Sequence, residues 1–206
     1  MGTLMIVDYG VGNLGSILNM CKKIGVDAKI SSNIQDIEEA EKIILPGVGA
    51  FDNAMKNLKD SGMISILNKK VIKDKTPLLG ICLGMQLLTK RSEEGSLEGL
   101  DWIDAETVRF RLSDNKSLKI PHMGWNTIDI KKDFCLYEDL YEEPRFYFVH
   151  SYYVKCNNSD NILTTTSYGI EFCSSVINGN ILGVQFHPEK SHKFGMKVLK
   201  NFAVLC

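Results

Sequence analysis

The sequence has no apolar run approaching the roughly 20 residues that span a bilayer, and it does not begin with the basic and apolar segments of a secretory leader. It also has no excess of charge, because 24 Lys and Arg residues face 25 Asp and Glu residues. Such a balance creates no field that would attract phosphate backbones or anionic lipids. We therefore expect a cytoplasmic protein that binds neither nucleic acid nor a membrane.

Paired cysteine motifs are missing as well. The six cysteines are scattered along the chain, with no CxxC pair and no clustered histidines beside them. This spacing predicts neither a zinc site nor a disulfide framework, and nothing else indicates a metal or a cofactor. A scattered cysteine is most often a small buried side chain, so a functional cysteine needs its own argument.

The remaining composition is that of an ordinary globular protein, with 206 residues, 44% hydrophobic residues and only 5 prolines. A chain of this length can bury a substantial core. No internal repeat, low-complexity tract or linker divides it. We predict a single domain over residues 1–206.

The first half alternates strand-like and helix-like segments. Apolar runs predict strands at 4–7, 28–31, 43–45 and 77–81, and helical periodicity marks 14–24, 34–40 and 51–73. Asn13 is a candidate N-cap for the first helix, and Pro46-Gly47 is expected to end the third strand. Strands separated by helices form a parallel sheet covered on both faces. The predicted fold class is therefore α/β, with an open, mostly parallel twisted sheet.

The second half is rich in β-structure, which we expect as an addition to that sheet. The strand-like stretches lie at 102–112, 119–130, 145–155, 162–166 and 172–185. Asn178-Gly179 predicts a tight hairpin with a type I′ turn. A final helix is predicted at about residues 193–204.

The strongest local signal is an apolar strand that runs into Gly80-x-Cys82-x-Gly84 and then into a helix. This is the pattern of a nucleophile elbow, with cysteine in place of serine. The glycines permit a turn so sharp that Cys82 projects from it, and the positive end of the helix favours a thiolate. The N–H of Leu83 would point to where an oxyanion forms. The motif also arises by chance, so the interpretation requires a base elsewhere.

His187 is the best candidate for that base, because it stands where an apolar strand ends and Glu189 follows two residues later. In an extended segment these residues lie on the same side, so the carboxylate can orient the imidazole and stabilise its protonated form. The alternative is a structural histidine, which the cysteine elbow disfavours. His150 has no such carboxylate and is expected to line a pocket or pack in a sheet. His122 and His192 would bind a partner or face solvent.

The loop Gly47-Val48-Gly49 leaves a strand that neighbours the strand of Cys82 if the sheet is doubly wound. Ligands bind at the carboxyl edge of such sheets. The glycines allow close approach of the backbone, so an inward peptide N–H would be a second oxyanion donor. A plain turn or a phosphate loop is the alternative, although a phosphate loop would end in Lys-Ser or Lys-Thr rather than Ala50-Phe51.

Together, three ordered motifs resemble those of the class I, or triad, glutamine amidotransferases across essentially the whole chain. The motifs are Pro46-Gly47-Val48-Gly49, Gly80-Ile81-Cys82-Leu83-Gly84-x-Gln86 and His187-Pro188-Glu189. The resemblance implies a flavodoxin-like fold and a glutaminase in which the Cys82 thiolate attacks the carboxamide of glutamine, with His187 and Glu189 assisting. It implies an oxyanion hole formed by Gly47, Val48, Gly49 and Leu83. It also implies glutamine-binding roles for Gln86, His150, Ser151 and Tyr152.

Three further segments, 8–14, 121–126 and 147–152, resemble one branch of this family. In that branch the glutaminase forms a heterodimer with a cyclase subunit, a (β/α)8 barrel that uses the ammonia in histidine biosynthesis. The resemblance implies that Asn13, Trp125 and Lys190 lie at the interface, although Trp125 is equally compatible with a core or plain surface position. The glutaminase motifs leave no room in this chain for an ammonia-using synthase, so a separate partner is expected.

Other functions remain open at this point. A related branch serves enzymes that amidinate or aminate sugars for surface polysaccharides, and residues 187–196 are compatible with it. A stand-alone cysteine hydrolase, such as a γ-glutamyl hydrolase, would be active without a partner. A degenerate scaffold would need a broken triad, whereas Cys82, His187 and Glu189 are all present.

Overall fold

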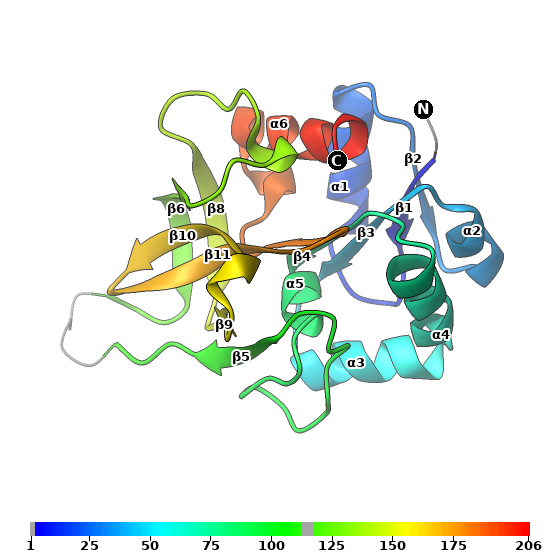
Figure 1. The fold of residues 1–206 in the computed structure, drawn as a ribbon, viewed down its shortest axis with the longest axis horizontal. Coiled ribbons are helices and arrows are strands. Elements are labelled where there is room, and N and C mark those ends of the chain that lie inside the picture. The colour runs from blue at the N-terminus through cyan, green and yellow to red at the C-terminus, as the bar shows by residue number, and fades with distance from the viewer. Residues whose placement is uncertain (1–2, 113–117) are drawn as a thin grey trace.

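The fold is described from a computed structural model, which covers residues 3–112 and 118–206. Its centre is a sheet whose strands follow the order β2-β1-β3-β4-β12-β11-β10-β7 (Figure 1). The parallel part consists of β1 (Leu4–Val7), β2 (Ala28–Ser31), β3 (Lys42–Gly47), β4 (Leu78–Cys82) and β12 (Ile181–Val184). This arrangement confirms the predicted α/β class and the doubly wound order, with β3 beside β4.

The antiparallel part extends the sheet beyond β12, as the β-rich second half predicts. It contains β11 (Ile170–Asn178), β10 (Ile162–Tyr168) and β7 (Asp129–Ile130), and β9 (Tyr152–Cys156) joins β11 to β5 (Ala105–Arg109). A separate two-stranded ribbon is formed by β6 (His122–Thr127) and β8 (Arg145–His150). This ribbon stands beside the carboxyl ends of the parallel strands, since His187 N donates to Tyr147 O at 2.9 Å.

Helices cover both faces of the sheet (Figure 1). One core cluster lies under α1 (Leu14–Lys23) and α6 (His192–Val204). The other lies under α2 (Ile34–Glu39), α3 (Phe51–Asp60), α4 (Met63–Leu67) and α5 (Leu83–Leu87). Short turns of helix complete the fold: η1 (Asn68–Lys73), η2 (Cys135–Tyr137), η3 (Ser159–Asn161) and η4 (Pro188–Lys190). Within the described residues, no helix has the length and apolar character needed to cross a membrane.

The prediction that the third strand ends at Pro46-Gly47 is wrong, because β3 continues through both residues. Pairing with β1 stops at Ile44, and the Pro46 carbonyl accepts a hydrogen bond from the Tyr9 hydroxyl on that same side. At Pro46, β3 therefore no longer forms backbone hydrogen bonds to β1. Because no N–H is needed on that side of the strand, proline is tolerated there.

One local prediction also needs correction, and two are confirmed. The hairpin between β11 and β12 exists, but its loop residues are Gly179 and Asn180, and only Gly179 has positive φ, whereas a type I′ turn needs both. The helical segments predicted over 51–73 are present as α3, α4 and η1, and Gly62, with φ of 71°, separates α3 from α4. Asn13 does occupy the N-cap position of α1, but its side chain makes no capping hydrogen bond.

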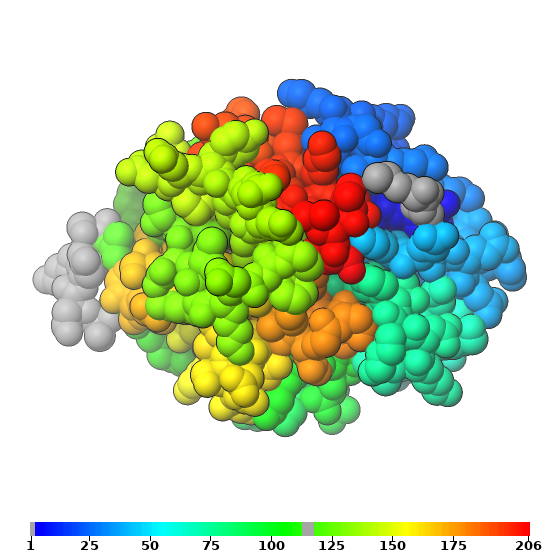
Figure 2. Space-filling view, turned by 45° about the horizontal axis from the view of Figure 1, so that its top comes forward, coloured from blue at the N-terminus to red at the C-terminus, as the bar shows by residue number. Residues whose placement is uncertain are grey.

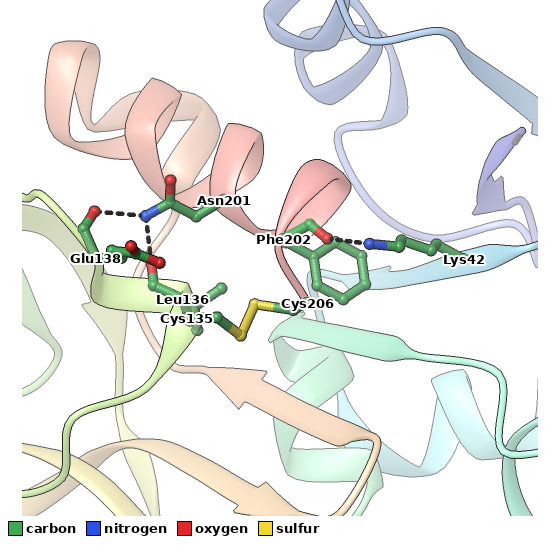
Figure 3. The surroundings of a disulfide bond; sticks show 7 residues. All are labelled: Lys42, Cys135, Leu136, Glu138, Asn201, Phe202 and Cys206. Atoms are coloured by element: carbon green, nitrogen blue, oxygen red, sulfur yellow. Dashed lines mark hydrogen bonds between the residues drawn. A yellow bond between two sulfur atoms is a disulfide. The ribbon is translucent and has the colours of Figure 1, made fainter. Parts of the chain in front are cut away.

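A disulfide links Cys135 to Cys206, contrary to the prediction that no disulfide forms. The two residues are 71 positions apart, so their spacing gave no signal, but the fold places the end of α6 against η2 (Figures 2 and 3). Asn201 strengthens this contact, because its side-chain amide donates to the carbonyls of Leu136 and Glu138 at 3.2 and 2.8 Å. The C-terminal helix is thus fastened to the β-rich half.

Candidate active site

The predicted elbow is present at Cys82, which ends β4 and immediately precedes α5. Cys82 has φ of 54°, a backbone conformation that is costly for any residue except glycine. Close packing holds this turn, because a Cβ on Gly84 would lie 1.8 Å from the Leu45 carbonyl oxygen, and one on Gly80 would lie 2.8 Å from Gly84 O. Both glycines of the motif are therefore required by the tight strand-to-helix packing that makes Cys82 project.

The loop Gly47-Val48-Gly49 lies directly beside this elbow, since Gly47 pairs with Cys82 in the sheet. A Cβ on Gly47 would meet the Tyr9 hydroxyl at 2.8 Å and Leu83 Cβ at 2.9 Å, so only glycine fits here. Gly49 has φ of 103°, and neither Val48 nor Gly49 donates a backbone N–H to a backbone carbonyl of the described residues. Leu83 is the first residue of α5, so its N–H also lacks a partner within the helix.

A second loop closes over the start of α3, just after Gly49. The Glu94 carboxylate accepts a hydrogen bond from Phe51 N at 2.9 Å. Asp52 reciprocates by accepting from the backbone N–H groups of Ser96 and Leu97, both at distances of about 3 Å. These exchanges fix the helix start next to the candidate oxyanion loop. Sequence reasoning missed Glu94, because a carboxylate among charged residues looks like part of a solvated loop.

The candidate base and its carboxylate are joined as predicted. Nδ1 of His187 donates to a Glu189 oxygen at 2.8 Å, and both side chains are only 2% exposed. The local geometry differs from the predicted extended segment, because Pro188–Lys190 form a single 3-10 turn. With Nδ1 acting as the donor, Nε2 is the nitrogen left to exchange a proton with Cys82.

The electrostatic surroundings favour the protonated form of His187. Burial alone would lower the pKa of this imidazole, but the adjacent sulfur of Cys82 and the Glu189 carboxylate raise it to about 10. Nε2 makes no well-formed hydrogen bond to a described residue, so the influence of Cys82 comes from proximity. At neutral pH the imidazole of His187 is therefore protonated where it faces Cys82.

Ser191 holds the backbone of the candidate base in place. Its hydroxyl donates to His187 O at 2.6 Å and accepts from Tyr147 N at 2.9 Å, and the residue is fully buried. These two bonds attach the turn that carries His187 and Glu189 to β8.

A pair of buried amides lies on the other side of Cys82. Nε2 of Gln86 donates to Tyr152 O and to Gln185 Oε1, each at 3.1 Å. Nε2 of Gln185 in turn donates to Cys82 Sγ at 3.7 Å. Gln185 was missed by sequence reasoning, although a polar residue two positions before His187 in an apolar strand points to the same side as that histidine.

His150 is buried and lines the pocket, as expected, but His122 is also buried rather than exposed. Nδ1 of His150 donates to Tyr152 O at 2.8 Å, and Nδ1 of His122 lies 3.0 Å from His150 Nε2. Burial lowers the pKa of His150 to about 3 and that of His122 to about 4. The alternating pattern of β6 could have revealed His122, since Met123 and Trp125 occupy the opposite, exposed face.

These residues converge on one pocket with a volume of about 330 Å³. Most of the predicted site residues line it: Val48, Gly49, Cys82, Leu83, Gln86, His150, Ser151, Tyr152, His187 and Lys190. Glu189 and Gly47 do not line the pocket. Glu189 contacts His187 on its Nδ1 side, and Gly47 is the last residue of β3. The pocket walls also include Glu94, Pro121 and Val149, which were not predicted. Among the described residues, no group of three or more His, Cys, Asp or Glu side chains could hold a metal ion.

Of the three predicted interface residues, only Lys190 lines the pocket. Trp125 is 44% exposed, stacks on His192 at 5.4 Å between ring centroids, and packs edge-on to Tyr147. Lys190 extends over the same Tyr147 ring at 5.7 Å. Asn13 is exposed at the start of α1, a helix that packs against η4 and thus lies near Lys190.

Comparison with known proteins agrees with this geometry. The chain matches the family described as Glutamine amidotransferase class-I over residues 5–206. It belongs to this family and is a glutamine amidotransferase.

Among its relatives is Imidazole glycerol phosphate synthase subunit HisH 2 of Methanococcus maripaludis, with 60% identity covering 97% of this chain and 98% of the relative. The subunit HisH 2 of Pseudomonas aeruginosa is 49% identical, covering 98% and 99% of the two chains. Among solved structures, PurLQS from Thermotoga maritima has a TM-score of 0.72 at 17% identity, with 98% of both chains covered. At that identity, the last likeness concerns the fold alone.

Proposed function

We propose that this chain is the glutaminase subunit of an imidazole glycerol phosphate synthase, acting in the cytoplasm as a single domain. It hydrolyses glutamine and delivers the ammonia to the cyclase subunit HisF, which converts PRFAR to imidazole glycerol phosphate and AICAR in histidine biosynthesis. The observation that carries this proposal is the convergence of Cys82, His187 and Glu189 at one pocket, in a chain 60% identical to a HisH subunit.

In the first step, the Cys82 thiolate attacks the side-chain carbonyl carbon of glutamine. The negative charge that develops on the carbonyl oxygen is stabilised by backbone N–H groups of Leu83 and of the Gly47 to Gly49 loop. His187 gives its Nε2 proton to the nitrogen, the C–N bond breaks, and ammonia leaves a γ-glutamyl thioester. Glu189 stabilises the imidazolium from which that proton comes.

In the second step, a water molecule attacks the thioester. Neutral His187 takes a proton from the water, and the C–S bond breaks with its electron pair returning to Cys82. The products are glutamate, a thiolate and an imidazolium, so glutamine and one water yield glutamate and ammonia. The next cycle begins with His187 protonated, which is the form that the resting site favours.

Glutamine is held by the wall opposite the triad. Both hydrogens of the Gln86 amide nitrogen are already donated to Tyr152 O and Gln185, so only its oxygen can face a ligand. An acceptor in that position suits the α-ammonium group of glutamine. Ser151 and His150 complete this wall of the pocket.

The partner binds around the mouth of the pocket, where apolar side chains are exposed. Met123 and Trp125 are 61% and 44% exposed on the outer face of β6, and Val48 is 43% exposed on the candidate oxyanion loop. A tryptophan of this kind suits an interface anchor. Because Val48 lies on both this surface and the pocket wall, contact with the partner reaches the loop that must arrange the oxyanion donors.

The function is tested by glutamate release from the purified chain, alone and with HisF plus PRFAR, with Cys82→Ala as the inactive control. We expect a large rise on mixing that Cys82→Ala lacks. Trp125→Ala should weaken binding to HisF by about 30-fold, the effect of an anchor worth about 2 kcal/mol. Ile34→Ala is the control, since Ile34 is 45% exposed and lies among residues of α4 and η1 rather than beside β6. Strong activity without a partner would instead identify a stand-alone hydrolase.

A second candidate is the glutaminase subunit of a sugar-amidinating or sugar-aminating enzyme for surface polysaccharides. Residues 187–196 are compatible with this branch, which is the reason for keeping it. The glutaminase chemistry would be the same and the partner would differ. Failure of HisF with PRFAR to stimulate an otherwise intact Cys82 site would favour this candidate.

A further inference from the structure

Gln185 is a fully buried side chain that touches the reacting sulfur and has no part in the chemistry described so far. It follows directly after β12 and is enclosed between Gln86 and Cys82. Its oxygen accepts from Gln86 Nε2 at 3.1 Å, and its nitrogen lies 3.7 Å from Cys82 Sγ. The side-chain amide of Gln185 can donate a hydrogen bond to the sulfur only if its nitrogen, and not its oxygen, faces Cys82.

The backbone carbonyl of Tyr152 determines which way this amide faces. A carbonyl oxygen can only accept hydrogen bonds. Gln86 must therefore turn its nitrogen toward Tyr152 O, and the second N–H of that nitrogen is directed at Gln185. Gln185 must receive it with its oxygen, which leaves its own nitrogen facing Cys82. The direction of every bond in this chain follows from one backbone atom.

The same carbonyl also fixes a second branch. Because Tyr152 O accepts from His150 Nδ1 as well, His150 Nε2 must accept from His122 Nδ1 if both imidazoles are neutral. Nε2 of His122 then accepts from the Asn126 amide nitrogen, which also donates to Ser167 O. Burial keeps both histidines neutral, and Tyr152 O uses one lone pair for His150 Nδ1 and the other for Gln86 Nε2. The anchor of the amide chain is therefore rigid.

We propose that Gln185 is a catalytic residue that donates a hydrogen bond to the Cys82 thiolate. Hydrogen bonds to a charged acceptor are stronger than those between neutral groups, so the donor favours the thiolate over the thiol. The titratable groups that face Cys82 are His187 and Tyr9, and the charged Glu94 and Lys190 line the same pocket. Gln185 adds a donor that does not titrate.

The role in turnover rests on the proposed glutaminase. When the thioester is hydrolysed, the C–S bond breaks and its electron pair returns to the sulfur. The Gln185 N–H is already directed at that atom, so it stabilises the departing thiolate as the negative charge forms. His187 is then taking a proton from water and becomes the imidazolium beside the same sulfur.

The test measures alkylation of Cys82 by iodoacetamide against pH, in the full chain without glutamine, at the Cys82 peptide by mass spectrometry. Gln185→Met keeps the length of the side chain and removes the donor. We expect the midpoint of its alkylation profile to rise by about one pH unit, so that at any pH below the parent midpoint the alkylation rate is about tenfold lower. Gln185→Glu, which presents oxygen to the sulfur, should shift the midpoint further.

Gln86→Glu tests the predicted direction of the amide chain with Gln185 still present. A carboxylate at position 86 can only accept, so Gln185 would turn its nitrogen toward it and its oxygen toward Cys82. Alkylation should slow as in Gln185→Met, and combining Gln86→Glu with Gln185→Met should add little. Independent effects of the two substitutions would contradict the chain of bonds.

A folded Gln185→Met protein with an unchanged alkylation profile would overturn the proposal, folding being checked by circular dichroism and melting temperature. If Gln185→Met does not fold, Gln86→Glu carries the same test. Failure of the proposed function looks different. A wild-type chain that releases no glutamate with any partner would leave the alkylation comparison intact, because that experiment uses no substrate.

Discussion

Two histidines line the same pocket in opposite protonation states. His187 and His150 are both almost fully buried, yet the pKa of His187 is raised to about 10 and that of His150 is lowered to about 3. Burial acts in the same direction on both, since it disfavours the charged imidazolium. The difference must therefore come from their partners.

Those partners differ in charge rather than in hydrogen-bonding capacity. Nδ1 of each imidazole donates at 2.8 Å, to the Glu189 carboxylate in one case and to the Tyr152 carbonyl in the other. The second nitrogen of His187 faces Cys82, whereas that of His150 faces the uncharged His122. The side of the pocket at His187 thus holds a proton that can be transferred. On the side of His150 and His122 the protons stay on fixed nitrogens and set the direction of the neighbouring hydrogen bonds.

Replacing Glu189 with Gln should give His187 an uncharged partner like that of His150, with the largest effect on activity. Loss of the carboxylate removes the group that orients the imidazole and stabilises its charge. By analogy with the same change in a serine triad, we expect turnover to fall about 1,000- to 10,000-fold. Glutamate release in the stimulated complex is the measurement, and Glu98→Gln on an exposed loop is the control. A loss smaller than tenfold would mean that Cys82 alone polarises His187.

Replacing Asn126 with Asp should do the reverse for His122. The amide nitrogen of Asn126 lies 3.2 Å from His122 Nε2. A carboxylate at this position would accept a hydrogen bond from Nε2 once that nitrogen is protonated, and would so stabilise the imidazolium. The pKa of His122 should rise from about 4 by about 1 to 3 units. Nuclear magnetic resonance titration of the imidazole nitrogens measures it. Asn161→Asp is the matched control, since Asn161 also donates to a backbone carbonyl but lies far from His122 in the chain. An unmoved His122 would contradict this geometry.

The smallest effect should appear in the pH dependence of stability. His187 has a folded pKa above its ordinary value, so its contribution is complete below about pH 6.5 and is lost as the pH rises toward 10. His150 and His122 have lowered pKa values, so their contribution is complete above about pH 6.5 and is lost as the pH falls toward 4. Stability should therefore be greatest near pH 6.5.

Urea unfolding at a series of pH values measures these slopes, which reach about 1.4 kcal/mol per pH unit for each histidine. Glu189→Gln should flatten the alkaline side of the curve, and Asn126→Asp the acid side. Comparison with the parent chain removes the common contribution of other carboxylates. If Glu189→Gln changed the acid side of the curve and Asn126→Asp the alkaline side, the protonation states assigned to His187 and His122 would be wrong.

The residues that sequence reasoning identified share one property, which is that local chain geometry places them. The glycines around Cys82 and the short spacing from His187 to Glu189 act within a few residues, so their roles follow from the sequence. The strand order also follows, because βαβ units allow few arrangements. The class of fold and the residues of the proposed triad were therefore predictable.

What remained hidden depends on contacts between distant segments. Gln185 meets Gln86 across 99 positions, and Glu94 meets Phe51 across 43. His122 seemed free for a partner because its position under Tyr168 and Phe148 exists only after the ribbon folds back. Cys135 and Cys206 become neighbours only through the packing of α6 on η2. The alternation along β6 marks His122 as buried, but no local pattern encodes which distant residues meet.

The Cys135–Cys206 bond closes a covalent ring that includes β8 through α6. His187 and Glu189 lie on this ring, whereas Cys82 lies on the open arm that precedes it. A protease that cuts the backbone once inside the ring therefore releases no fragment, and the two ends stay joined until the disulfide is reduced. Under oxidising conditions, such a nicked chain keeps the proposed base, His187, tethered to the proposed nucleophile, Cys82.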